Sequence, residues 1–192
     1  MLSRLKFVLK PVERFLGRIP VSPSTLTILG FISSLIAMFF LSTGLFVEGG
    51  VFVLISGFFD ILDGMVARVR GKVSRRGAIL DSVLDRLSEI AIFSGIFLFF
   101  SREPSELGRI ATLLAITGAL MVSYIRARCE VEGIEMRRGF MQRPERFFVL
   151  IVSIFLTPFF SMALKIGIMV IASLSYITAL ERLIIGLIKA KG

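Results

Sequence analysis

The chain has 192 residues, of which 55% are hydrophobic, and its formal net charge at pH 7 is +9. The mean hydropathy of +0.87 is strongly positive, which excludes an ordinary soluble globule and indicates a protein that crosses a membrane several times. The sequence has no His and a single Cys, Cys129. An internal disulfide is therefore excluded, and a structural zinc site is not expected.

The N-terminal residues 1–20 alternate apolar and basic positions, which is typical of an amphipathic helix at a membrane interface. Six apolar segments follow. We therefore expect an all-α polytopic membrane protein, with six transmembrane helices in a core over 21–192 preceded by an N-terminal interfacial amphipathic helix over 1–20, all in one domain (1–192). Loops are expected at 44–50, 101–108 and 126–146. The expected spans are residues 26–41, 51–68, 78–100, 110–125, 147–160 and 163–188.

The distribution of basic residues predicts the orientation of these spans. Nineteen of the 23 Lys and Arg residues fall in the N-terminal segment, the turn at 68–76, the 126–146 region and the C-terminal part. Six spans place these four regions on one side of the membrane, and basic residues are enriched on the cytosolic side. We expect a multi-pass cell-membrane protein with both termini and the acid-bearing turn on the cytosolic side, and nucleic acid is excluded as a partner.

Four aspartates recur at helical spacing in the second and third spans. Asp60 and Asp63 share one helix face, and Asp81 and Asp85 share another. If residues 70–76 form a turn, the two helices run antiparallel. Asp60 then lies level with Asp85, and Asp63 lies close to Asp81. The deepest of these acids lie roughly 12 Å from the turn. The sequence thus predicts four converging acids just inside an apolar slab.

Carboxylates in an apolar setting need cations, and hard divalent ions prefer oxygen ligands. Such a site suits a substrate that is part lipid and part phosphate, since two ions can clamp a diphosphate. Arg68 could donate to phosphate oxygens, and without His the general base would be a carboxylate, for which Asp85 is our candidate. The alternative is a set of structural acids paired with Arg68 and Arg86. It is not favoured, because it does not explain why Gly64 and Ala67 lie on the same stripe.

The spacing Asp-x2-Asp-Gly-x2-Ala-Arg-x8-Gly-x3-Asp-x3-Asp over residues 60–85 resembles the signature of the CDP-alcohol phosphotransferases at all eight fixed positions. The resemblance implies a homodimer that transfers a phosphatidyl-type group from a CDP-linked lipid to an alcohol and releases CMP. It implies two Mg²⁺ ions, or Mn²⁺, held by Asp60, Asp63, Asp81 and Asp85, with Asp85 as proton acceptor. It also implies contacts with the CDP-lipid from Ser24 (where the family often has asparagine), Thr27, Gly64, Ala67, Arg68, Ser74 and Gly77.

Further cations indicate an acceptor that carries its own phosphate. The Ser123-Tyr-Ile-Arg126 segment and the Arg143-Pro-Glu-Arg146 segment resemble the branch that contains phosphatidylinositol phosphate and archaetidylinositol phosphate synthases. This second resemblance implies that myo-inositol phosphate is the acceptor. Arg126 stands where the branch often has lysine. The implied acceptor contacts are Ser123, Arg126, Arg146 and Arg182.

Other interpretations stay open at this point. Arg126 and its neighbours could be anchors for anionic lipid, and Arg182 could pair with Glu181. Glycerol-3-phosphate is an alternative acceptor, which would give phosphatidylglycerol phosphate; serine fits less well. An aspartate-rich prenyltransferase would need more helices and another acid spacing. A cation transporter would place its acids at the membrane midplane on broken helices.

Overall fold

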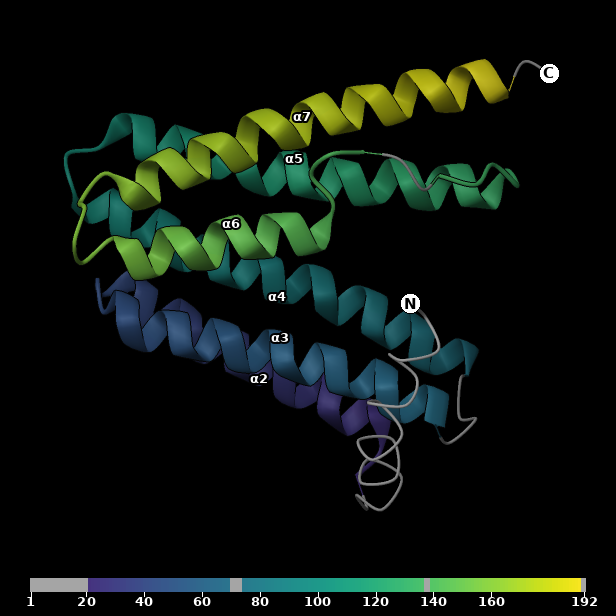
Figure 1. Ribbon diagram of the computed structural model, residues 1–192, viewed down its shortest axis with the longest axis horizontal. Helices are drawn as coiled ribbons and strands as arrows, with labels where there is room; N and C mark the ends of the chain where they lie inside the picture. Colours follow the sequence, from purple (N-terminus) through teal and green to yellow (C-terminus); the bar gives the residue numbers. More distant parts are fainter. Residues whose placement is uncertain (1–20, 70–73, 137–138, 191–192) are drawn as a thin grey trace, which may run out of the picture.

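The structure is a computed structural model, and it describes residues 21–69, 74–136 and 139–190. The predicted interfacial helix at 1–20 therefore lies outside the described residues. The described part is all helical, and successive helices run in opposite directions (Figure 1). The helices are α2 (Pro23–Ser42), α3 (Phe46–Val69), α4 (Arg75–Arg102), α5 (Glu106–Val131), α6 (Arg143–Leu156) and α7 (Ala163–Lys189).

Serine caps begin three of these helices. Ser22 precedes Pro23 and accepts a hydrogen bond from the Thr25 amide, while the Ser74 hydroxyl accepts one from Gly77 N at 3.0 Å. Ser105 does the same for α5. A serine at this position satisfies an amide that the first helical turn leaves without a partner. Each cap therefore sets where the helix, and the side chains it carries, begin.

The connections are shorter than the sequence predicted. The expected loop at 44–50 is wrong, because α3 already begins at Phe46. Gly44 makes the turn with a φ of +81°, where glycine is favoured. Gly49 and Gly50 instead lie buried within α3, and a Cβ on Gly49 would come within 2.7 Å of the Leu41 side chain. These two glycines thus permit close packing of α3 and do not mark a loop.

Four helices, α2, α3, α5 and α7, are long and apolar enough to cross a membrane by length and composition. The all-α membrane fold is therefore confirmed, and four of the six expected spans are supported in this way. The first half of α4 carries Asp81, Asp85, Arg86 and Glu89, which lowers its hydropathy. The 14 residues of α6 extend over only about 21 Å, less than the roughly 30 Å of a hydrocarbon core.

The short helix α6 starts part-way along the bundle. Beyond α5 the chain turns back along the bundle before α6 begins (Figure 1). The Met141 amide donates to Thr178 Oγ1 of α7 at 3.1 Å, and Arg146 Nη1 donates to the Met141 carbonyl at 2.9 Å. Gly139, at a φ of +132°, lies against Thr178 and Arg182. The fold-back places Arg143 and Arg146 of the first turn of α6 beside the acidic residues of α3 and α4.

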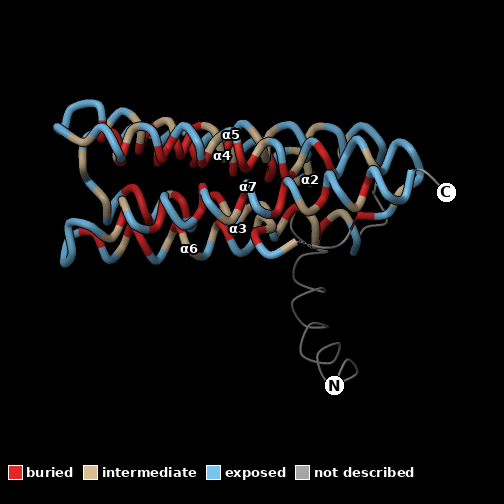
Figure 2. The backbone as a smooth tube through the Cα atoms, turned by 90° about the horizontal axis from the view of Figure 1, so that it is seen from above, coloured by how far each residue is buried: buried red, intermediate tan, exposed pale blue. Residues whose placement is uncertain are grey.

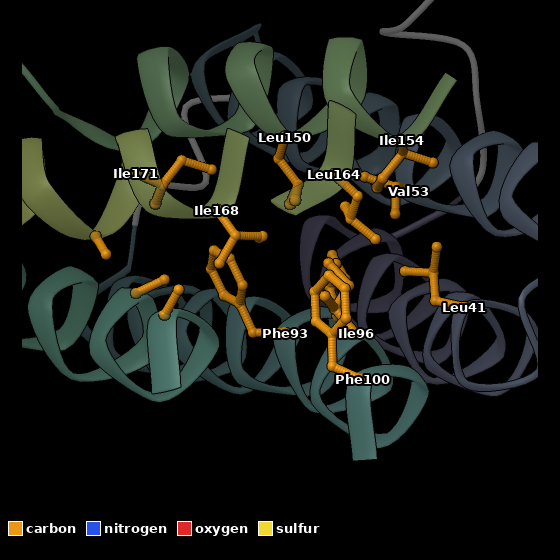
Figure 3. Packing of buried hydrophobic residues seen from close by; sticks show 14 of the residues in the cluster. Leu41, Val53, Phe93, Ile96, Phe100, Leu150, Ile154, Leu164, Ile168 and Ile171 are labelled. Atoms are coloured by element: carbon orange, nitrogen blue, oxygen red, sulfur yellow. The ribbon is translucent and has the colours of Figure 1, made fainter. Parts of the chain in front are cut away.

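The six helices of the described residues form two groups of three. Within the first group α2 packs closely against both α3 and α4, which touch each other little; α7 packs against α5 and α6 in the second. The groups meet mainly where α4 contacts α5 and α3 contacts α6. Figure 2 shows the buried residues facing the interior. In the core, Phe93, Ile96 and Phe100 of α4 face Leu164 and Ile168 of α7 (Figure 3).

The contact between α2 and α4 depends on Gly95, because a Cβ there would lie 2.6 Å from the Met38 carbonyl oxygen. We expect Gly95→Ala to force the two backbones apart and to lower stability by about 1–3 kcal/mol, the usual range for overpacking. The thermal unfolding midpoint of detergent-purified protein measures this. Leu98→Ala, at an exposed position of the same helix, is the control and should have a smaller effect. An unchanged midpoint for Gly95→Ala would contradict the close approach.

Candidate active site

Three aspartates from two helices form the centre of the site. One carboxylate oxygen from each of Asp60, Asp63 and Asp81 lies within 4.8 Å of the other two. Asp63 is only 5% exposed. The predicted convergence of the acids is therefore present, although α3 and α4 do not pair directly as expected. Helix α2 packs against both and holds their acids at the same level.

A hydroxyl from α2 orients the most buried acid. Thr27 Oγ1 donates to Asp63 Oδ2 at 2.7 Å and also lies 3.1 Å from the Pro23 carbonyl, one turn earlier in α2. Thr27 itself is buried. A hydrogen bond of this kind fixes the rotamer of the carboxylate and leaves its second oxygen for another partner.

The fourth acid, Asp85, is joined to Asp60 by Arg143. Arg143 Nη1 lies 2.8 Å from Asp85 Oδ2 and 2.8 Å from Asp60 Oδ2. Arg86 is a weaker partner of Asp85, at 3.5 Å. The main cation of the cluster thus comes from the first turn of α6. From the sequence, Arg143 stood out only as part of the Arg-Pro-Glu-Arg segment, and its position three residues before Arg146 was the available signal.

The acids fit a hard divalent cation. Asp81 Oδ1 is buried and has no hydrogen-bond partner within the described part of the protein, which is costly for a carboxylate oxygen unless a cation satisfies it. Together with Asp60 and Asp63 it offers only oxygen ligands, the set that Mg²⁺ and Mn²⁺ prefer. The site therefore meets the chemical requirements for binding a divalent metal.

A cavity of roughly 630 Å³ opens beside these acids. Its lining includes Asp63 and Asp81 at one side, and Ser22 and Pro23 at the start of α2. All seven residues that the sequence analysis assigned to the CDP-lipid line this one cavity, coming from α2, α3 and the start of α4: Ser24, Thr27, Gly64, Ala67, Arg68, Ser74 and Gly77.

Two glycines leave space at the wall of this cavity, because they carry no side chain. A Cβ on Gly64 would lie 3.5 Å from Arg68 Nη1, so the guanidinium lies over the glycine one turn away. A Cβ on Gly77 would lie 3.0 Å from the Ser74 hydroxyl, which is tighter than ordinary contact. Gly77 thus leaves room for the cap at the start of α4, and Gly64 leaves room beside the arginine.

The predicted acceptor-binding residues lie in different parts of the structure. Arg146 is 2% exposed and donates to both oxygens of Glu89, at 2.7 and 3.1 Å, beside a second cavity of roughly 490 Å³ that Asp60 and Arg143 also line. Arg182, equally buried, donates to the Val122 carbonyl at 2.8 Å and joins α7 to α5.

Ser123 and Arg126 lie elsewhere, in a groove of roughly 780 Å³ between α4 and α5 that Arg86 also lines. Arg126 is paired there with Glu130 at 2.8 Å. The structure therefore groups Arg146 with Asp60 and groups Ser123 with Arg126, and it does not bring all four predicted acceptor residues to one cavity.

The fold and the acid cluster define an all-helical membrane protein with a candidate site for a divalent metal. The family profile described as CDP-alcohol phosphatidyltransferase matches residues 20–180. The chain therefore belongs to the CDP-alcohol phosphatidyltransferase family and is an enzyme of this transferase class.

Similar proteins extend over nearly the whole chain. Archaetidylinositol phosphate synthase of Pyrococcus horikoshii is 37% identical over 191 residues, which cover 95% of this chain and 94% of the relative. Phosphatidylinositol phosphate synthase of Mycobacterium tuberculosis is 35% identical, covering 95% and 88%.

Two crystal structures of that mycobacterial enzyme are close in fold. The structure with manganese and citrate has a TM-score of 0.85 and 33% identity, covering 92% of this chain and 88% of the other. The structure with CDP-DAG bound has a TM-score of 0.82 and 34% identity, covering 90% of both chains.

The Thr27 hydroxyl should matter for metal binding, because it orients Asp63. We expect Thr27→Val to weaken Mn²⁺ binding by about tenfold or more, the usual effect of losing a partner that orients a ligand. Titration calorimetry of the detergent-purified protein gives the dissociation constant. Thr43→Val, whose hydroxyl contacts only carbonyls of its own helix, is the matched control and should leave Mn²⁺ affinity unchanged. Equal affinity in Thr27→Val and wild type would contradict the orienting role.

Proposed function

We propose that this enzyme transfers a phosphatidyl- or archaetidyl-type group from a CDP-linked lipid to myo-inositol phosphate, giving the lipid-linked inositol phosphate and CMP in phospholipid biosynthesis. The observation that carries the proposal is the cavity where seven residues of the predicted nucleotide site meet Asp63 and Asp81. The names of the relatives support the inositol phosphate acceptor, and the mycobacterial structure with CDP-DAG supports the donor.

The nucleotide end of the donor would bind in the cavity between the start of α2, the end of α3 and the start of α4. Arg68 would donate to phosphate oxygens, since a guanidinium presents several donors and keeps its charge. Ser24, Thr27 and Ser74 would offer hydroxyl groups from the lining, while Gly64, Ala67 and Gly77 have side chains small enough for the substrate to approach the backbone closely. The lipid chains would extend from there toward the apolar surface.

Asp60, Asp63, Asp81 and Asp85 would hold the metal, which we propose is a pair of Mg²⁺ ions, with Mn²⁺ as a substitute. The manganese in the structural neighbour supports this choice. When bound, such ions would supply positive charge that offsets the negative charge of the diphosphate and of the CMP leaving group. The protein's own contribution is to fix the four carboxylates through α2, α3 and α4.

Asp85 is our candidate for the general base. The acceptor oxygen attacks the phosphorus that carries the lipid, the bond from this phosphorus to the CMP oxygen breaks, and the hydroxyl proton passes to the Asp85 carboxylate. No His exists in the chain to take this role. Arg143 holds Asp85 beside Asp60, which keeps the base next to the other acids.

The acceptor phosphate would bind near Arg146 and Arg182, with Ser123 and Arg126 as further contacts. The first two are buried cations carried by α6 and α7 of the second group of helices. Because Ser123 and Arg126 lie in a separate groove, their contact with the same phosphate requires a rearrangement of that region. The alternative acceptor glycerol-3-phosphate also carries a phosphate and would use the same cations.

We propose that all six helices lie within the bilayer and that the segment 1–20, which precedes them in the sequence, lies at the membrane interface. The start of α6 part-way along the bundle accounts for its short length. Both termini and the active site would face the cytosol, which the enrichment of Lys and Arg at that end supports. We also propose a homodimer, on the basis of the family resemblance. The molar mass of the protein in detergent, measured by light scattering, tests this.

The acceptor is tested by supplying the purified protein with Mg²⁺, a CDP-linked ester or ether lipid and one acceptor at a time. We expect CMP release with myo-inositol phosphate and only background release with free inositol, serine or glycerol-3-phosphate. Chromatography of the nucleotides measures CMP directly. CMP release that depends on glycerol-3-phosphate would overturn the acceptor and leave the transferase class in place.

The base is tested by Asp85→Asn, which keeps the shape of the side chain and removes its basic oxygen. We expect turnover to fall by about 10²–10⁴-fold, as for loss of a general base. Binding of the CDP-linked lipid, followed by calorimetry, should persist. The control is Glu103→Gln, a carboxylate at the opposite end of the bundle, which should retain full turnover. Normal turnover in Asp85→Asn would remove Asp85 from this role.

A further inference from the structure

Both oxygens of Asp60 are already engaged by a cation that belongs to the protein. Arg143 Nη1 lies 2.9 Å from Asp60 Oδ1 and 2.8 Å from Asp60 Oδ2. The same nitrogen lies 2.8 Å from Asp85 Oδ2. Asp60 also belongs to the group of three acids whose oxygens approach within 4.8 Å. One carboxylate is therefore shared between an arginine of α6 and the candidate metal site.

We propose that Arg143 is an internal counter-cation, a positioning residue that competes with the divalent ion for Asp60 while it holds Asp85 in place. The inference rests on the proposed metal site and adds a residue that the family signature at 60–85 does not contain. Arg143 comes from the other group of three helices, so the charge balance of the acids depends on where α6 begins.

The electrostatics give the direction of the effect. Four carboxylates lie close together, and a guanidinium in contact with two of them offsets part of their repulsion. A divalent ion that binds Asp60 must displace the guanidinium from at least one oxygen and must approach a fixed positive charge. Arg143 therefore stabilises the acids and at the same time weakens the binding of the ion.

The surroundings keep Arg143 at this position. It opens α6, so the positive end of the helix also points toward the acids. One turn later Arg146 is held by Glu89 of α4 and by the Met141 carbonyl. These contacts fix the first turn of α6 against α4, so the backbone at Arg143 cannot move away from the acids without breaking a second, buried ion pair.

The test is Mn²⁺ binding to the full-length protein, measured from the electron paramagnetic resonance signal of free Mn²⁺. We expect Arg143→Gln to bind Mn²⁺ about tenfold more tightly than wild type, because about 1.4 kcal/mol of competing interaction corresponds to that factor. In chelator, its thermal midpoint should fall below that of wild type, and Mn²⁺ should raise the midpoint more than it does in wild type.

Two further variants complete the experiment. Arg102→Gln removes an arginine at the opposite end of the bundle, where it donates to the Ser42 carbonyl, and should leave Mn²⁺ affinity unchanged. Arg143→Lys keeps the charge but offers a single ammonium instead of a planar fork, so we expect an affinity between those of wild type and Arg143→Gln. This variant decides the question if the glutamine variant does not fold.

The outcomes separate this inference from the proposed function. If wild type binds no Mn²⁺, the metal site itself is wrong. If wild type binds Mn²⁺ and both Arg143 variants bind with the same or lower affinity, the metal site stands and the competition by Arg143 is wrong. Tighter binding in the Arg143 variants together with unchanged binding in Arg102→Gln supports the inference.

Discussion

Crowding of like charge inside an apolar bundle is the constraint on which this structure depends. Asp60, Asp63, Asp81 and Asp85 lie together on two helices of a bundle whose core is largely hydrophobic. Such a group persists only if each oxygen has a donor or a cation. Thr27 supplies one donor, Arg143 supplies a cation, and one oxygen of Asp81 is left to an ion. The need to give each carboxylate oxygen a donor or a cation therefore determines both the chemistry of the site and its stability.

The helix that carries none of the acids determines how they meet. Helix α2 has no charged residue, yet it packs against both helices that carry the acids, and its Thr27 hydroxyl donates a hydrogen bond to Asp63. Its close approach to α4 depends on Gly95, and its approach to α3 depends on Gly49. Small residues at these contacts set the separation of α3 and α4. The geometry of the acids thus follows from packing some distance away from them.

Much of the site could be predicted from the sequence because it is local. Helical periodicity placed the acids on two faces, and the fixed spacing from Asp60 to Asp85 pointed to the residues that line the first cavity. The fold-back before α6 could not be predicted, since it depends on a hydrogen bond between Met141 and Thr178 of a distant helix. Arg143 was therefore missed as a partner of the acids. The loop prediction at 44–50 was wrong because glycine is common both in turns and where helices pack closely, and Gly49 and Gly50 serve the second purpose.

The position of Arg143 in the chain has a consequence for biogenesis. Asp60 and Arg143 are 83 residues apart. At the roughly 5–20 residues per second of protein synthesis, several seconds pass before the arginine follows the aspartate out of the ribosome. During this interval α3 and α4 carry their acids uncompensated by α6. A divalent ion is the available substitute, so the supply of metal bears on how the nascent chain folds as well as on the finished site.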